Sequence, residues 1–154
     1  MRILIAVDGS PYSDAALNEV SRRTWPEGSE ILIVHAFDPL LALPSDAWTV
    51  PADYYHRIDP AAHKQANSII DAAVRKLKSD LDDVEIRGKS IIGSPKRVIL
   101  DEAETFKADL IVVGAHGYRT WDRLLLGSVS QAVVSHAKCS VEVVRLPQPK
   151  QAAA

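Results

Sequence analysis

DLIVVGAHGYRTWDRLLLGSVS, residues 109–130, is the stretch of the chain that decides its fold. It begins with an apolar run, Leu110 to Val113, that has no polar alternation and stops at Gly114. Such a run is typical of a strand buried on both faces, as in a parallel sheet covered by helices. The stretch ends on apolar residues at helical spacing, for which Ser128 is the expected N-cap. The order strand, glycine-containing loop, helix predicts an α/β fold.

The glycines of this stretch predict a ligand site. In an open α/β sheet, ligands bind beyond the carboxyl ends of the strands. Glycine lets the backbone approach a ligand closely, and the free N–H groups at the start of a helix favour an anion. Residues 127–130 would offer N–H groups and two hydroxyls to a phosphate. Alternatively, Gly114 and Gly117 only turn the chain and Gly127 only relaxes the entry into the helix, and the residues alone leave both interpretations open.

The rest of the chain alternates between strand and helix patterns. Strands are expected at residues 2–7, 30–37, 84–92, 110–113 and 140–146. Helices are expected over residues 11–23, 60–79, 95–106 and 128–137. Because every connection between successive strands contains a helix, the sheet should be parallel. Polar–apolar alternation in the third and fifth strands indicates that these two are edge strands.

Bulk properties exclude several classes of protein. The 154 residues suit one domain, expected at residues 1–146 with a flexible tail at 147–154. The formal charge of -2 argues against a dedicated nucleic-acid binder. A single cysteine, Cys139, excludes an internal disulfide framework and fits a reducing compartment. A strand within the first residues leaves no room for a signal peptide, and no apolar run is long enough to cross a membrane, so we expect a cytoplasmic protein.

Four polar residues are candidates for chemistry. Asp8 follows the first strand, where it could bond nearby N–H groups of a turn or accept from a ribose hydroxyl, a base edge or a metal. Arg119 is equally compatible with a phosphate contact and with a solvated charge. His116 has no assignable Ser, Cys or Asp partner for proton transfer, so we interpret it as shaping the loop. His35 has no metal-ligand spacing to another His or Cys and is interpreted as a packing residue.

The spacing Gly114-x-x-Gly117, nine residues and then Gly127-Ser128, directly after a buried strand, resembles the nucleotide-binding signature of the universal stress protein family. Residues 3–10, 93–95 and 136–145 resemble that family's first strand and acidic turn, third-helix entry, and last helix and strand. The resemblance covers roughly residues 2 to 146, except for 38–59. It implies a Rossmann-like five-stranded parallel sheet, in the order 3-2-1-4-5, with helices on both faces. Asp8 and Gly114 would then meet where the strand order reverses.

The resemblance also implies a ligand and the residues that contact it. The ligand would be ATP, with Mg²⁺ screening the triphosphate and Asp8 as the metal contact. The implied contacts, with Arg119 added as a phosphate partner, are Ala6, Val7, Asp8, Ala36, Gly114, Ala115, His116, Gly117, Arg119, Gly127, Ser128, Val129 and Ser130. The first four would surround adenine and ribose, and the last four would hold the phosphates. One departure from the pattern is Ala115, where many relatives carry Ser, and this removes a hydroxyl.

Resemblance further implies that the last strand, Val141 to Arg145, pairs with its mate in a homodimer. The implied role is that of an ATP-binding stress-response or signalling module, with no catalytic residue assigned. Two alternatives stay open. One is a dimeric interaction module that binds no nucleotide, and the intact glycines count against it. The other is a slow ATPase or self-phosphorylating protein, against which the missing general base and the absent P-loop lysine count.

Overall fold

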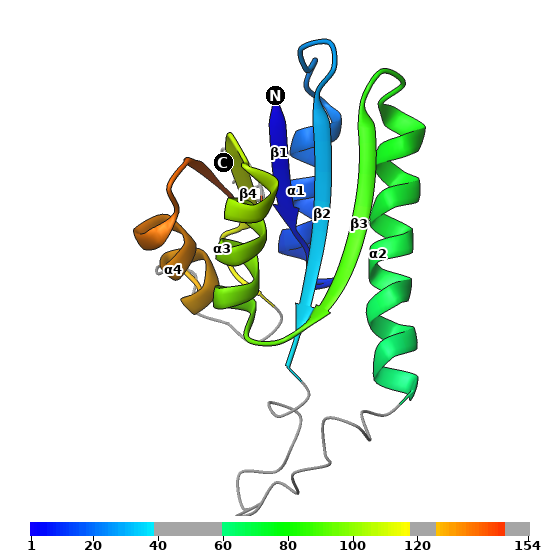
Figure 1. The fold of residues 1–154 in the computed structure, drawn as a ribbon. Helices are drawn as coiled ribbons and strands as arrows, with labels where there is room; N and C mark the ends of the chain where they lie inside the picture. The colour runs from blue at the N-terminus through cyan, green and yellow to red at the C-terminus, as the bar shows by residue number, and fades with distance from the viewer. Residues whose placement is uncertain (39–59, 118–125, 147–154) are drawn as a thin grey trace, which may run out of the picture.

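The computed structural model describes residues 1–38, 60–117 and 126–146. Within them, five parallel strands form one sheet in the order β3-β2-β1-β4-β5, with helices on both faces (Figure 1). The strands are β1 (Arg2–Ala6), β2 (Glu30–Phe37), β3 (Glu85–Ile92), β4 (Leu110–Gly114) and β5 (Ser140–Val144). The helices are α1 (Pro11–Ser21), α2 (Pro60–Asp80), α3 (Pro95–Phe106) and α4 (Ser128–His136). The expected fold class, strand order and two edge strands are confirmed, whereas the expected tail at 147–154 lies outside the described residues.

The core has two layers because the central strands are covered on both faces. Alternate residues of β1, β2 and β4 face opposite ways. One set, including Ile3, Ile5, Ile31, Ile33 and Val112, packs with buried residues of α1 and α2. The other set, including Leu4, Leu32, Val34, Ile111 and Val113, packs with buried residues of α3 and α4. Double-sided burial is therefore the reason for the uninterrupted apolar runs in these strands.

Local sequence explains where α1 starts. The hydroxyl of Ser10 caps the helix by accepting a hydrogen bond of 3.3 Å from the Ser13 N–H, and Pro11 occupies the first turn. Serine at the cap and proline directly after it are the residues that the first turn of a helix favours. Since Ser10 is only 1% exposed, the cap also fixes the chain where it leaves β1.

The expected N-cap of α4 was wrong by one residue. The helix begins at Ser128, and its N-cap is Gly127, which has an extended backbone with φ -61° and ψ 154°. No side chain caps this helix at that position. Instead the hydroxyl of Ser130 donates to the carbonyl oxygen of Gly127 at 2.9 Å. The sequence pattern predicted that Ser128 caps the helix. In the structure the serine of the first turn whose hydroxyl bonds to the backbone is Ser130.

No helix in the described part of the chain combines the length and the apolar character needed to cross a membrane. Four strands differ from the expectation by one or two residues: β1 stops at Ala6, β4 at Gly114 and β5 at Val144, and β3 begins at Glu85. Val7 still donates its N–H to the carbonyl oxygen of Val34 at 2.9 Å, so the hydrogen-bond ladder of β1 continues past the assigned end.

Candidate functional site

The carboxyl ends of β1 and β4 meet at the point where the strand order reverses. The two strands pair directly, with Ile5 opposite Val112. Beyond their ends, a side-chain Cβ at Gly117 would lie 2.8 Å from Oδ2 of Asp8. The loop after β4 therefore reaches the acidic turn after β1, with Gly117 rather than Gly114 at the contact. Ligands of open α/β sheets bind beyond such strand ends, and the region between Asp8, Gly117 and the start of α4 is called the crevice below.

Asp8 has a structural role at this point. Its Oδ1 accepts a hydrogen bond of 3.0 Å from the N–H of Ser10, which closes the turn between β1 and α1. Gly9, between them, has a positive φ of 76°, a conformation that glycine adopts without strain. The interpretation of Asp8 as a turn residue is confirmed, because its Oδ1 bonds within the turn. Its Oδ2 is directed toward residues 114–117, which are called the glycine loop below.

The glycines of the signature allow close packing. Among the glycines of the chain, positive φ values occur at Gly9, Gly28 and Gly93, none of which belongs to the signature. A Cβ at Gly114 would lie 2.8 Å from the backbone carbonyl carbon of Tyr12, and one at Gly127 would lie 3.3 Å from the carbonyl oxygen of Ala115. Gly114 needs to be glycine because the backbone of Tyr12 passes close to it, and Gly127 lies in a tight backbone contact, so these glycines do more than turn the chain.

Ala115 is held in place through its backbone. Its N–H donates to the carbonyl oxygen of Val144 at 2.7 Å, and its own carbonyl oxygen accepts from the N–H of Gly127 at 2.8 Å. The hydroxyl of Ser130 donates to the same carbonyl oxygen at 2.9 Å. Ala115 is only 1% exposed. The residue joins the glycine loop to β5 and to the start of α4, and the departure from serine falls on a buried side chain.

The start of α4 supplies donors for an anion. The N–H of Gln131 donates to the carbonyl oxygen of Gly127, so the N–H groups of Ser128, Val129 and Ser130 precede the first hydrogen bond of the helix. Ser128 is exposed, whereas Ser130 is 3% exposed and its hydroxyl is directed to backbone carbonyls. The structure thus offers one exposed hydroxyl at this helix start, where the sequence suggested two.

His116 and Arg119 differ in what the structure says about them. The His116 ring packs edge-on against the ring of Tyr12, with ring centroids 5.0 Å apart. Its Nδ1 is buried and has no hydrogen-bond partner among the residues that the structure describes. These contacts are those of a residue that shapes the loop. Arg119 lies outside the described residues.

Small side chains mark the strand ends where adenine was expected. Ala6 and Ala36 are half-buried at the carboxyl ends of the neighbouring strands β1 and β2. Val7 is 5% exposed and both its backbone polar groups are bonded, the N–H to Val34 and the carbonyl oxygen to Nδ1 of His35 at 2.8 Å. His35 is 7% exposed, which confirms that it is a packing residue. Its hydrogen bond to Val7 was not expected from the sequence, where the only signal was a polar residue ending an apolar strand.

The described side chains of the crevice do not form a cage for a metal ion. In residues 1–38, 60–117 and 126–146 there is no group of three or more His, Cys, Asp and Glu side chains that could hold one. Asp8 brings a single carboxylate to the crevice. Mg²⁺ is commonly held by one or two carboxylates, the phosphates of a ligand and water. The residues present therefore fit a cation that arrives with a phosphorylated ligand rather than a resident ion.

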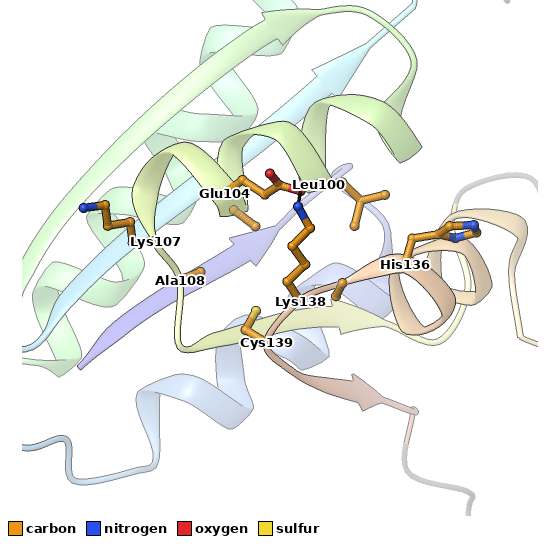
Figure 2. Close-up of a pocket in the computed structure, with 9 residues that line it drawn as sticks. Leu100, Glu104, Lys107, Ala108, His136, Lys138 and Cys139 are labelled. Carbon is orange, nitrogen blue, oxygen red and sulfur yellow. Dashed lines mark ion pairs between the residues drawn. The ribbon is translucent and has the colours of Figure 1, made fainter.

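A pocket of about 260 Å³ lies away from this crevice, between α3 and α4 (Figure 2). It is near the amino ends of β4 and β5, and an ion pair of 2.9 Å joins Lys138 to Glu104 beside it. Its ionisable lining groups on these helices are exposed, and burial together with the charge of Asp109 raises the pKa of the Cys139 thiol. An inward polar group that would anchor a ligand is missing from this lining, so the candidate site remains at the opposite end of the sheet.

Comparison with known proteins adds to this geometry. The model of the universal stress protein family matches residues 1–145. A universal stress protein A homolog from Coxiella burnetii is 34% identical over 148 residues, which are 94% of this chain and 94% of the relative. The solved universal stress protein UspA from Lactobacillus plantarum superposes with a TM-score of 0.74 at 26% identity, covering 94% of this chain and 97% of that one.

Two more distant structures share the fold and contain nucleotides. The universal stress protein from Archaeoglobus fulgidus in complex with dAMP has a TM-score of 0.64 at 22% identity, covering 94% of this chain and 97% of that one. A family member from Arabidopsis thaliana with AMP bound has a TM-score of 0.62 at 20% identity, covering 98% and 97%. At these identities the likeness is one of fold.

Proposed function

The chain belongs to the universal stress protein family, and from that premise we propose that it binds an adenine nucleotide, as Mg-ATP, at the crevice between β1 and β4. The observation that carries the proposal is the approach of Gly117 to Asp8, beside the N–H groups that precede the first hydrogen bond of α4. A close glycine backbone and the start of a helix are the elements that bind phosphate in α/β folds. The AMP and dAMP of the two distant relatives support the choice of an adenine nucleotide.

In this proposal each part of the crevice has a separate task. Ala6, Val7 and Ala36 border the base, and the small side chains of the two alanines leave room for a flat ring. Oδ2 of Asp8 accepts a hydrogen bond from a ribose hydroxyl or contacts the cation. The N–H groups of Ser128 and Val129 and the hydroxyl of Ser128 hold the phosphates. Gly114, Ala115, His116 and Gly117 form the wall against ribose and phosphate, with Arg119 as a further phosphate contact.

Ser130 has a different task from its neighbours. Because its hydroxyl donates to Ala115 and Gly127, we assign its side chain to holding the glycine loop against α4. Its N–H remains at the helix start and still faces the phosphate position in the proposal. Residues 127–130 thus offer the ligand backbone N–H groups and the hydroxyl of Ser128, whereas the hydroxyl of Ser130 bonds within the protein.

The proposed role is a cytoplasmic stress-response or signalling module that acts as a homodimer through β5. A free edge strand needs protection, and pairing with a second copy provides it. Slow hydrolysis of ATP is the alternative activity. It would show as phosphate release above the protein-free rate that is lost in both Gly117→Val and Ser128→Ala.

Calorimetric titration of Mg-ATP into the wild type and Gly117→Val tests the nucleotide site. We expect micromolar binding, about -8 kcal/mol, in the wild type. Binding should disappear in the variant, because its side chain would occupy the space between the loop and Asp8. AMP should bind more weakly than ATP if the start of α4 holds phosphates.

The matched control is Gly28→Ala. Gly28 lies in a distant turn with φ 72°, and a Cβ added there would meet no atom within 4 Å, so alanine strains the backbone without touching the crevice. This variant should lose stability and keep its affinity for Mg-ATP. Absence of heat in a wild type checked to be free of co-purified nucleotide would contradict the proposal and favour an interaction module.

A further inference from the structure

The carbonyl group of Val7 is fixed by a side chain from the neighbouring strand. Nδ1 of His35 lies 2.8 Å from this carbonyl oxygen, and the contact is buried. The N–H of Val7 also bonds to β2, where it donates to the carbonyl oxygen of Val34. Val7 is therefore held on both sides of its Cα by β2, although it lies past the last residue of β1.

The Val7 carbonyl belongs to the peptide bond that carries the N–H of Asp8. Because a peptide group is planar, holding its oxygen also sets the direction in which Asp8 leaves the strand. Asp8 in turn places Oδ1 on the N–H of Ser10 and Oδ2 against Gly117. A chain of contacts thus runs from the His35 ring to the carboxylate in the crevice.

The ring of His35 is itself held in place. It stacks on Phe37, with ring centroids 6.0 Å apart and an interplanar angle of 11°. Phe37 is met edge-on by His63 of α2, with centroids 5.5 Å apart. With 7% exposure, His35 has little freedom to take another rotamer. The ring contacts therefore fix the direction of its hydrogen bond.

We propose that His35 is a positioning residue for the nucleotide site, which orients the Val7–Asp8 peptide and through it the Asp8 carboxylate. The inference rests on the proposed function for its effect on affinity, but its structural part does not. A carbonyl oxygen only accepts hydrogen bonds, so His35 must carry a hydrogen on Nδ1. This fixes the tautomer of the neutral ring, which a long-range ¹H–¹⁵N correlation spectrum reads directly.

The variants His35→Asn and His35→Leu separate the hydrogen bond from packing. The side-chain amide nitrogen of Asn stands at the same number of bonds from Cβ as Nδ1 of His, so Asn keeps the donor. Leu has a similar size and has no donor. We expect His35→Leu to weaken Mg-ATP binding about tenfold and His35→Asn to stay within about threefold of the wild type.

Leu77→Ala is the control for lost stability. Leu77 is fully buried toward the far end of α2, so its truncation destabilises the fold without touching the crevice. It should leave the affinity for Mg-ATP unchanged. If Leu77→Ala weakens binding as much as His35→Leu, or if His35→Asn is as weak as His35→Leu, the positioning role is wrong.

Backbone amide shifts of the protein without nucleotide keep this test apart from the proposed function. In His35→Leu the amide signals of Asp8 and Gly117 should move, and in His35→Asn they should return toward their wild-type positions. Unmoved signals in His35→Leu, or a ring protonated at Nε2 alone, would overturn the inference. A wild type that binds no nucleotide would contradict the proposed function, while these shifts would still decide the role of His35.

Discussion

At the scale of single residues, the signature glycines differ in what surrounds them. A Cβ at Gly114 would meet the backbone of Tyr12, with its carbonyl carbon at 2.8 Å and its oxygen at 2.9 Å. A Cβ at Gly117 would meet Oδ2 of Asp8, which is the end of a side chain and not backbone. Backbone in a packed helix moves less easily than a carboxylate. Gly114 is therefore required by the fold, and Gly117 is required by the crevice.

We predict that Gly114→Ala loses about 1–3 kcal/mol of unfolding free energy, the range found when groups are forced into a packed interior. Gly117→Ala should lose clearly less stability but more affinity for Mg-ATP. Urea unfolding of both variants, followed by titration, measures the two effects. Equal losses of stability would mean that Asp8 is held as rigidly as the backbone of Tyr12.

Cys139 predicts a pH dependence of stability. Burial, followed by the negative charge of Asp109, raises the pKa of this thiol above its ordinary value of 9.0. The unfolded chain therefore ionises first, and the stability that the thiol contributes is complete below pH 9.0 and falls as pH rises through the higher folded-state pKa. Urea unfolding at pH 8 and pH 10 should show a larger loss for the wild type than for Cys139→Ala. The same pH dependence in both proteins would contradict the prediction.

At the scale of elements, the packing of α2 on β3 depends on a missing side chain. A Cβ at Gly88 would lie 2.5 Å from Cγ2 of Ile70 and 2.8 Å from Cγ2 of Val74. The helix approaches the edge strand at this point because glycine leaves the space for two branched side chains. The role of Gly88 is therefore this helix contact.

Gly88→Ala should therefore lower the unfolding free energy by about 1–3 kcal/mol through overpacking. The loss should fall in the double variant Gly88→Ala/Ile70→Ala relative to the sum of the two single changes, because Ile70→Ala removes the methyl group that is struck. A double-mutant cycle by urea unfolding measures this coupling. Additive losses would show that α2 shifts as a whole and that Ile70 is not the obstacle.

A second link between elements holds the other edge strand. Both carboxylate oxygens of Glu142 in β5 accept hydrogen bonds of 2.7 Å from Arg23, which follows α1. Arg23 also binds Glu19 at 2.7 Å, and hydrogen bonds to Glu19 and Glu142 raise its pKa above the ordinary value. These side chains are about a quarter to two fifths exposed, so solvent screens the pair and it orients β5 more than it stabilises the fold.

At the scale of the whole molecule, the two edges of the sheet are protected differently. The edge strand β3 carries charged side chains. Arg87 pairs with Glu30 at 2.7 Å, and Lys89 pairs with Glu102 at 2.8 Å. On β5, Val141, Val143 and Val144 are half-buried. Charges discourage pairing along an edge, and an apolar edge favours it. The proposed homodimer is thus expected at β5 and not at β3.

The substitution Val143→Pro tests that dimer. The carbonyl oxygen of Val144 accepts from Ala115, so Val144 is turned toward β4 and Val143 is turned toward the free edge. Proline at position 143 would remove one outward N–H while leaving the bonds to β4. Sedimentation should show a monomer for Val143→Pro and a dimer for Val143→Ala, which loses the same packing but keeps the N–H. A dimer in both variants would place the interface elsewhere.

The sequence by itself determined the elements and pointed to the candidate site. Continuous apolar runs such as Leu110 to Val113 require burial on both faces, and serine followed by proline starts α1. These are local effects of hydrophobicity and backbone geometry, so they can be read from neighbouring residues. The strand order came from family resemblance, since pairing between strands is not encoded in any short segment.

Only the tertiary structure decided how the groups of the candidate site are held. Ser130 was expected to bind phosphate through its hydroxyl, but that hydroxyl donates to the carbonyl oxygens of Ala115 and Gly127, because Ala115 lies beside the start of α4. His35 was interpreted as a packing residue, and its bond to Val7 arises because β1 and β2 end side by side. The partners in these two hydrogen bonds are 15 and 28 residues apart in the sequence, and the packing of whole elements brings them together. Such contacts cannot be predicted from neighbouring residues in the sequence.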